Sequence, residues 1–212
     1  MPATVNAGDL LLMLVTGTDP NINSDPPGWT VLRASTQTPV YIKDAAGTED
    51  GGTVAIGTSS IAVQVYRITG WFDTGTILND IELATTTGSS TTPDPPALNP
   101  ANWDAEDTLW VAVAIASLPL TGYPSGYTGG VVTPTTGTWN IGSAQRDNNT
   151  ASENPGAFTM SGGSTGWRTY TIAIRPRLAL PLAIDGFEES DEFGSALDFE
   201  FIQAIHLSGL AE

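Results

Sequence analysis

Two stretches of the chain share one pattern, a polar turn that contains Asp followed by a short apolar run. They are residues 6–15 and residues 104–115. Gly17, Pro20 and Pro119 close the two runs early, and runs of this length bounded by turn residues are typical of strands buried on both faces. Neither run approaches the roughly 20 apolar residues of a membrane-spanning helix. We predict that both are central strands of one β-sandwich.

Shorter strand candidates follow the first run. They are residues 29–32, 39–43 and 61–68. The last of these alternates regularly and carries apolar side chains on both faces, which suits a strand inside a sheet rather than at its edge.

The second half of the chain repeats the first in outline. Residues 124–128 correspond to residues 26–30, residues 144–160 to residues 41–56, and residues 170–175 to residues 62–68. The same order of strands and turns over four blocks predicts two half-repeats, at about 4–83 and 97–176. Two four-stranded Greek keys that form a jelly roll would give this pattern, and two separate small domains would give it too.

A low-complexity stretch rich in Thr and Pro, residues 85–96, joins the halves. It could be a flexible linker between domains. We favour a strand followed by a long crossover within one sandwich, because neither half alone looks large enough for an ample core. We therefore predict an all-β protein, an antiparallel, jelly-roll-like β-sandwich over residues 1–177.

The composition changes after Arg177. Residues 178–212 alternate between apolar and acidic stretches, and we expect a C-terminal arm outside the sandwich that docks on the domain or on a neighbouring subunit. The apolar side chains expected at that interface are Leu180, Leu182, Ile184, Phe187, Phe193, Phe199, Phe201 and Ile205.

Charge and composition limit the partners. The formal net charge is −16, only 14% of the residues are charged, and there are 23 Gly and 15 Pro. Such a surface repels nucleic acid and anionic membranes. The chain has no Cys, which excludes disulfides and thiolate chemistry, and residues 1–4 lack the pattern of a signal peptide. We expect the chain to stay in the cytoplasm where it is made unless an assembly carries it out.

Catalytic and metal chemistry have few candidates in this sequence. The single His, His206, lies between apolar neighbours in the arm, where packing is its expected role. The acidic residues at the strand starts, Asp9, Glu106 and Asp107, are expected to cap turns rather than to hydrolyse glycosides. Carboxylates that crowd two loops could offer oxygen ligands to Ca²⁺, although they also fit ordinary hairpin turns. These calcium candidates are Asp44, Glu49, Asp50, Asp147 and Glu153.

Aromatic residues offer a second type of site. Trp29 and Trp110 lie in patterned strands and are expected in the core. Tyr123, Tyr127 and Trp139 lie in expected loops and could stack on sugar rings, although buried packing is the stronger expectation for them as well.

The strand starts and turns together resemble a β-sandwich module of tailed-phage virion proteins. The resemblance rests on Gly-Asp-Leu-Leu-Leu, Pro-Pro-Gly-Trp-Thr-Val-Leu, Asp-Thr-Leu-Trp-Val-Ala-Val-Ala and the closing residues 167–176, and it spans roughly residues 6–176. It implies capsid decoration proteins, head fibres or tail-fibre segments.

We therefore expect a non-enzymatic, oligomeric virion protein without a required cofactor. The leading expectation is a decoration or cement protein that binds the major capsid protein or sister subunits on the outer shell. The alternative is a glycan- or receptor-binding module of a head or tail fibre, and a glycoside hydrolase is the third and weakest alternative.

Overall fold

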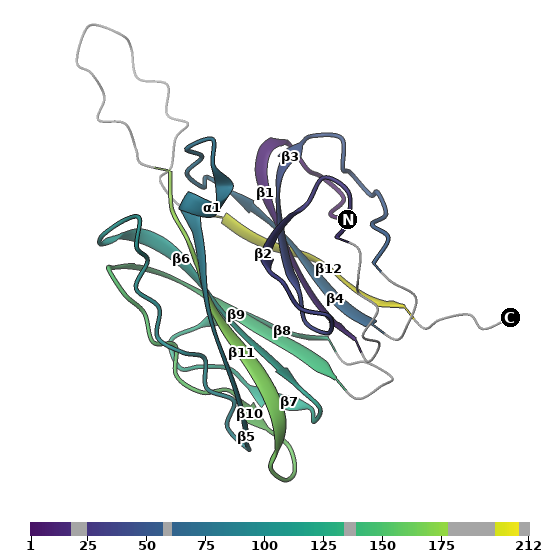
Figure 1. The fold of residues 1–212 in the computed structure, drawn as a ribbon, viewed down its shortest axis with the longest axis vertical. Helices are drawn as coiled ribbons and strands as arrows, with labels where there is room; N and C mark the ends of the chain where they lie inside the picture. The colour runs from purple at the N-terminus through teal and green to yellow at the C-terminus, as the bar shows by residue number, and fades with distance from the viewer. Residues whose placement is uncertain (18–24, 57–60, 134–138, 178–197, 208–212) are drawn as a thin grey trace, which may run out of the picture.

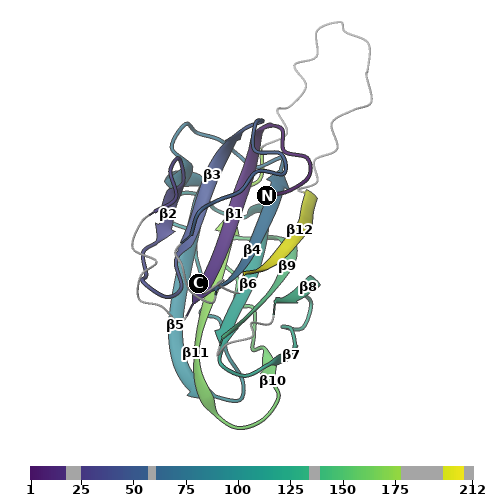
Figure 2. The ribbon, with the colours of Figure 1, turned by 90° about the vertical axis from the view of Figure 1, so that its right-hand side faces the viewer.

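The structure is a computed structural model that describes residues 1–17, 25–56, 61–133, 139–177 and 198–207. Within these ranges it is an antiparallel β-sandwich of two five-stranded sheets (Figure 1). One short helix, α1 (Ile77–Asp80), lies near the end of the sandwich opposite the small sheet of β7 and β10 (Figure 2). No helix in the described ranges has the length and apolar character needed to cross a bilayer.

The first sheet contains the first predicted central strand. Its order is β12-β4-β1-β3-β2. The bounds are β1 (Ala7–Gly17), β2 (Thr30–Arg33), β3 (Val40–Ala46), β4 (Ile61–Thr69) and β12 (Asp198–Leu207). Residues 9–17 of β1 are all buried, because β3 and β4 flank its edges, the second sheet covers one face and other segments cover the opposite face.

The second sheet has the order β5-β11-β6-β9-β8. The bounds are β5 (Ile81–Ser90), β6 (Glu106–Ala116), β8 (Thr128–Thr133), β9 (Asn140–Thr150) and β11 (Thr165–Ile174). The strand β6 is the second predicted central strand and is buried from Thr108 onward. A separate two-stranded sheet pairs β7 (Leu120–Gly122) with β10 (Thr159–Met160).

The two sheet orders match strand by strand, and the match reveals an exchange between the halves. β1, β2, β3 and β4 correspond to β6, β8, β9 and β11. The strand that follows β4 in the chain, β5, joins the sheet of the second half beside β11, and the described strand that follows β11, β12, joins the sheet of the first half beside β4. Each half therefore completes the sheet of the other.

The two connections that carry out this exchange meet at one end of the sandwich. Trp71 and Pro176 form an isolated bridge. The amide N–H of Phe72 donates to the Arg175 carbonyl at 2.9 Å, and the N–H of Arg177 donates to the Gly70 carbonyl at 2.7 Å. These hydrogen bonds place the two crossing segments side by side.

A core shared by both sheets shows that the halves form one sandwich rather than two small domains. Its largest cluster of buried residues includes Leu10 and Leu12 from β1 together with Leu109 and Val111 from β6. Alternate residues of each central strand face this layer, as period-two geometry requires. The opposite faces pack against loops instead, as Trp110 does beside Leu98 and Trp103.

Two details differ from the expectations. Each half has the order β4-β1-β3-β2 or its equivalent, whereas a Greek key places the fourth strand beside the first and follows it with the second and third; a jelly roll is therefore not confirmed. The described part of the expected arm, β12, docks on the domain, which is one of the two expected alternatives, but it does so as an edge strand of the first sheet rather than outside the sandwich.

Candidate functional site

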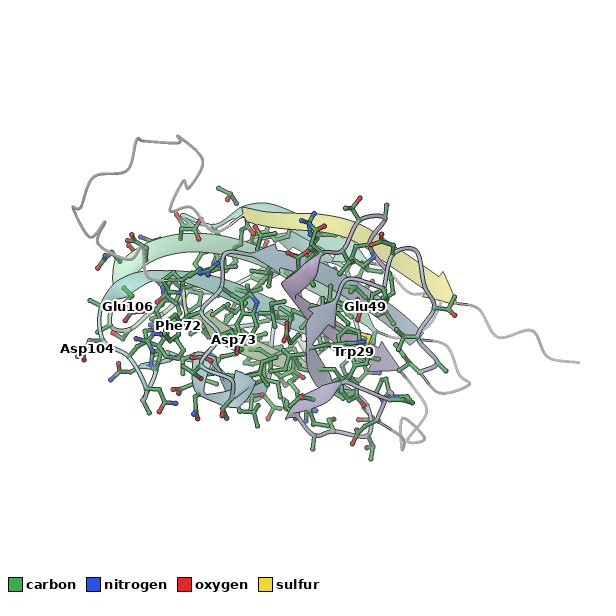
Figure 3. The ribbon with its side chains drawn as sticks, turned by 90° about the horizontal axis from the view of Figure 1, so that it is seen from above. Trp29, Glu49, Phe72, Asp73, Asp104 and Glu106 are labelled. Atoms are coloured by element: carbon green, nitrogen blue, oxygen red, sulfur yellow. The ribbon has the colours of Figure 1, made fainter. Side chains whose placement is uncertain are left out.

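A polar hollow of about 300 Å³ lies at the end of the sandwich where the crossing segments meet. It is lined by Gly28, Thr30, Lys43, Asp44, Trp71, Asp73, Gly75 and Ile77. Strand β3 supplies Lys43 and Asp44, the segment after β4 supplies Trp71 and Asp73, and a turn before β2 supplies Gly28. Figure 3 looks onto this end of the molecule and labels Asp73, with Trp29 and Glu49 nearby.

The ammonium group of Lys43 is held by a neighbour in the turn that follows β3. Its Nζ lies 2.8 Å from Oε1 of Glu49. The Glu49 carboxylate also accepts hydrogen bonds from the N–H groups of Ala46 and Thr48. The Lys43 hydrogen bond and these backbone donors outweigh the effect of burial and lower the pKa of Glu49 to about 2. At neutral pH the Glu49 carboxylate is therefore ionised, and its contact with Lys43 fixes the position of that side chain at the rim.

The two aspartates of the hollow both have exposed side chains, and their charges interact. Partial burial, followed by the negative charges of Asp73 and Glu49, raises the pKa of Asp44. Asp73 is exposed, and its Oδ1 accepts the N–H of Gly75 at 2.7 Å. The floor beneath them is the buried ring of Trp71, whose Nε1 donates to the Gly8 carbonyl at 2.8 Å. This arrangement can hydrogen-bond a polar ligand, but it offers that ligand little aromatic surface.

A second group of side chains stands beside the hollow, around Arg175. Its Nε and Nη2 donate to both carboxylate oxygens of Glu106, at 2.9 and 2.8 Å. The guanidinium carbon lies 4.5 Å from the ring centre of Phe72, and the Glu106 hydrogen bond raises the pKa of Arg175. In Figure 3, Phe72 and Glu106 lie close together at this end. The bidentate pair joins the end of β11 to the start of β6.

The turn at the hollow has a counterpart in the second half. The N–H of Trp29 donates to the Pro26 carbonyl at 3.1 Å, and that of Tyr127 donates to the Pro124 carbonyl at 3.2 Å. The third residue of each turn is a Gly with φ near +80°, a backbone region that favours Gly. The predicted correspondence between residues 26–30 and 124–128 is therefore confirmed in geometry.

The carboxylates considered for calcium are divided between the two sheets and mostly bind groups of the protein. Glu49 binds Lys43, Asp50 accepts the Val5 N–H, and Glu153 lies 3.5 Å from the Arg146 guanidinium. Burial and then the charge of Asp107 raise the pKa of Asp147. In the part of the chain that the structure describes, no three His, Cys, Asp or Glu side chains come together as a metal site, so calcium gains no support there.

The aromatic candidates for sugar stacking do not share one platform. Tyr123 is exposed and meets Phe158 edge to face at 6.2 Å. Tyr127 is half-buried, its hydroxyl has no hydrogen-bond partner among the described residues, and burial followed by the charge of Glu153 raises its pKa. Trp139 packs against the core between the sheets. Tyr123 is thus the one of the three with an exposed ring.

Asp9 caps the turn before β1, as expected. Its Oδ2 accepts the Asn6 N–H and the Nε of Arg67, both at 2.6 Å. Glu106 likewise binds a side chain of the protein, the Arg175 guanidinium. His206 lies in β12 opposite Ala62, and the structure does not describe its side chain.

The apolar arm residues are described only in part. Phe199, Phe201 and Ile205 lie in β12, in register with Ile68, Tyr66 and Val63. The other five interface candidates, Leu180, Leu182, Ile184, Phe187 and Phe193, lie outside the described residues.

Sequence reasoning did not bring Trp71, Asp73 and Arg175 together as parts of one site. A signal was present, because Gly70-Trp71-Phe72-Asp73 places two aromatics and an acid directly after a buried strand. The position of Arg175 beside Phe72 depends on the exchange of strands between the halves, which the repeat alone does not indicate. No family model, curated protein or solved structure matches this chain.

Proposed function

We propose that this chain is a non-enzymatic structural protein of a phage virion, a decoration or cement protein on the outer surface of the capsid. The observation that carries the proposal is the structural use of the motifs on which the resemblance rests. Gly8 and Asp9 form the turn at the start of β1, the Pro-Pro-Gly-Trp turn precedes β2, and residues 167–174 form most of β11.

The buried and half-buried charges of the scaffold support the same proposal. Asp9 binds Arg67, Glu49 binds Lys43, Glu106 binds Arg175 and Glu153 binds Arg146. Each of these pairs connects separate strands or turns of the sandwich. These ion pairs thus join parts of a scaffold that can present a surface.

The attachment to the shell is assigned to the segment between β11 and β12, which carries five of the predicted interface residues. An acidic body with net charge −16 would orient its apolar segment toward the shell and its charged surface toward solvent. Burial of its apolar side chains against the shell would supply the affinity.

Purified particles from cells that make the chain test the proposal. We expect the chain to copurify with particles at close to one copy per major shell subunit. A variant with Leu180→Ser, Leu182→Ser and Ile184→Ser keeps β12 and should lose binding to shells, whereas an exposed control, Leu78→Ser, should bind normally. Absence of the chain from particles would refute a virion role, and normal binding of the triple variant would refute the role of the segment.

A fibre module that binds glycans is the second candidate, and the polar hollow favours it. Lys43, Asp44 and Asp73 at its rim have the hydrogen-bonding groups that sugar hydroxyls need, and Tyr123 is an exposed ring elsewhere on the surface. A glycan array with the wild type, Asp73→Ala and Tyr123→Ala separates the two candidate positions. A handful of copies per particle together with glycan binding would favour the fibre over decoration.

A further inference from the structure

The edge of β5 differs from the other sheet edges that the structure describes. Pairing shifts register between Val31 and Arg33 in β2, between Thr128 and Val131 in β8, and between Phe201 and Gln203 in β12. Such irregularities protect an edge from adding another strand. The pairing of β5 with β11 is continuous from Ile81 to Ser90.

The residues of β5 do not supply the usual chemical protection either. Residues 84–90 read Ala-Thr-Thr-Thr-Gly-Ser-Ser, without charge and without Pro. The strand has one charged residue, Glu82, near its start. Lys, Pro and inward-pointing charges are the devices that natural edges use against pairing, and the last seven residues of β5 have none of them.

The register shows which backbone groups are free to pair. The N–H of Arg175 donates to the Asp80 carbonyl at 2.9 Å, so this pair and every second pair after it are hydrogen-bonded across β5 and β11. Residues 82, 84, 86, 88 and 90 therefore point their N–H and C=O groups toward β11. Thr85, Thr87 and Ser89 direct theirs away from it, and their side chains are exposed.

We propose that this edge binds the β5 edge of a second copy of the chain, in antiparallel orientation about a two-fold axis. The pairing joins two five-stranded sheets into one continuous ten-stranded sheet. It goes beyond the proposed function and does not depend on it, since it concerns only how two copies meet.

Charge and side-chain chemistry favour a second copy as the occupant. Two chains with a net charge of −16 each repel one another, and the neutral stretch 84–90 is a place where they can approach. Antiparallel pairing within this stretch puts Thr and Ser opposite Thr and Ser, a favourable cross-strand combination. It also places the Glu82 side chains of the two copies at opposite ends of the paired region.

A single pair of strands buries less surface than a typical stable interface. The free chain should therefore dimerise weakly and in a concentration-dependent way. Attachment of many copies to one surface would strengthen the same contact by raising the effective concentration.

Analytical ultracentrifugation over a concentration series tests the proposal. We expect a reversible monomer–dimer equilibrium that Thr87→Lys weakens at least tenfold, because it adds charge at the centre of the edge. The matched control is Thr128→Lys, which adds the same charge to the exposed start of edge strand β8 and should leave dimerisation unchanged. A chain that stays monomeric up to millimolar concentration, or a dimer that Thr87→Lys does not weaken, would overturn the proposal.

Cross-linking gives a second readout that does not depend on affinity. Since the chain has no Cys, Thr85→Cys and Thr87→Cys each introduce a single thiol at the free edge. With the two-fold axis at Thr87, the two copies of residue 87 lie directly opposite one another. Thr87→Cys should therefore give covalent dimers with a short thiol-reactive cross-linker, and Thr85→Cys, whose opposite position is Ser89, should give fewer. The Thr128→Cys chain should give none. Equal cross-linking of all three variants, or none with either β5 variant, would contradict the assigned edge.

Discussion

A buried polar network between the two sheets gives the sharpest test of how the sandwich is held together. The side-chain amide of Gln64 in β4 donates to Oγ1 of Thr133 at 3.0 Å and to the Ile141 carbonyl at 3.2 Å. Its oxygen accepts from the hydroxyls of Tyr66 at 3.0 Å and Ser143 at 2.7 Å. Gln64 is fully buried, so none of these bonds can be replaced by bulk water.

The change Gln64→Leu keeps the volume and removes all four hydrogen bonds. The hydroxyls of Tyr66 and Ser143 retain each other, whereas the Thr133 hydroxyl and the Ile141 carbonyl each lose a partner. A stranded buried polar group costs about 1–3 kcal/mol, and a typical hydrogen bond contributes about 1 kcal/mol net. With the added apolar burial, we expect the free energy of unfolding to fall by about 2–4 kcal/mol.

The matched control is a buried hydroxyl in β1. Thr16 is fully buried, and its Oγ1 has no hydrogen-bond partner among the residues that the structure describes. Thr16→Val removes this hydroxyl at nearly constant shape and should leave stability unchanged or raise it by up to about 1 kcal/mol. The two changes thus have opposite expected signs.

Urea denaturation followed by tryptophan fluorescence measures both variants. A shift of the midpoint at constant slope reports a change in stability alone. A Gln64→Leu protein within 0.5 kcal/mol of wild type, or a Thr16→Val protein that loses about as much as Gln64→Leu, would refute the reasoning that hydrogen-bond satisfaction decides the effect of these buried polar groups.

Three further predictions concern acid stability and packing. Because Lys43 holds the pKa of Glu49 at about 2, below its usual value of 4.5, the stability advantage of wild type over Glu49→Gln should be complete above pH 4.5. In urea titrations it should vanish as the pH falls to about 2. Burial and Asp107 raise the pKa of Asp147 above 3.8, so Asp147→Asn should stabilise at pH 7, and its advantage should disappear below pH 3.8; a less stable variant at pH 7 would contradict this. A Cβ at Gly88 would lie 2.4 Å from the Trp167 ring, whereas one at Gly166 meets nothing within 4 Å; thermal melts should show Gly88→Ala destabilised by about 1–3 kcal/mol and Gly166→Ala unchanged or slightly stabilised.

The central strands could be predicted from the sequence because burial on both faces leaves a distinctive pattern. Residues 10–15 and 109–115 are uninterrupted apolar runs, and they became β1 and β6 at the centres of the two sheets. For the low-complexity stretch at residues 85–96, the favoured interpretation was a strand followed by a long crossover. The structure agrees with it, since β5 is a strand and residues 91–105 continue from it along the second sheet. Propensity and turn chemistry were sufficient for these elements because they are local.

The exchange of final strands could not be predicted from the repeat, because pairing partners are set by contacts distant in the chain. One signal was nevertheless available. Asp80-Ile81-Glu82-Leu83 at the start of β5 matches Asp198-Phe199-Glu200-Phe201 at the start of β12, and these strands occupy equivalent positions in the two sheets. This match extends the repeat into the residues that were interpreted as an arm.

The candidate site was harder to predict than the strands. Asp44 was visible in a crowded acidic turn with Glu49 and Asp50, but the hollow also needs Trp71 and Asp73 from a connection that passes over the sheet end. Its neighbour Arg175 contacts Phe72 across 103 residues of sequence, a separation over which residue patterns carry no distance information.

The hydrogen bonds between the crossing segments at Gly70 and Arg175 have a consequence for how this protein can be divided. A cut in residues 91–105 would give two fragments, each holding four strands of one sheet and the missing edge of the other. Neither fragment could close its own sheet, so the pair should fold only when mixed, as a split protein does. In the intact chain, unfolding of either half removes an edge strand from the sheet of the other half. Melting should therefore follow a single cooperative transition.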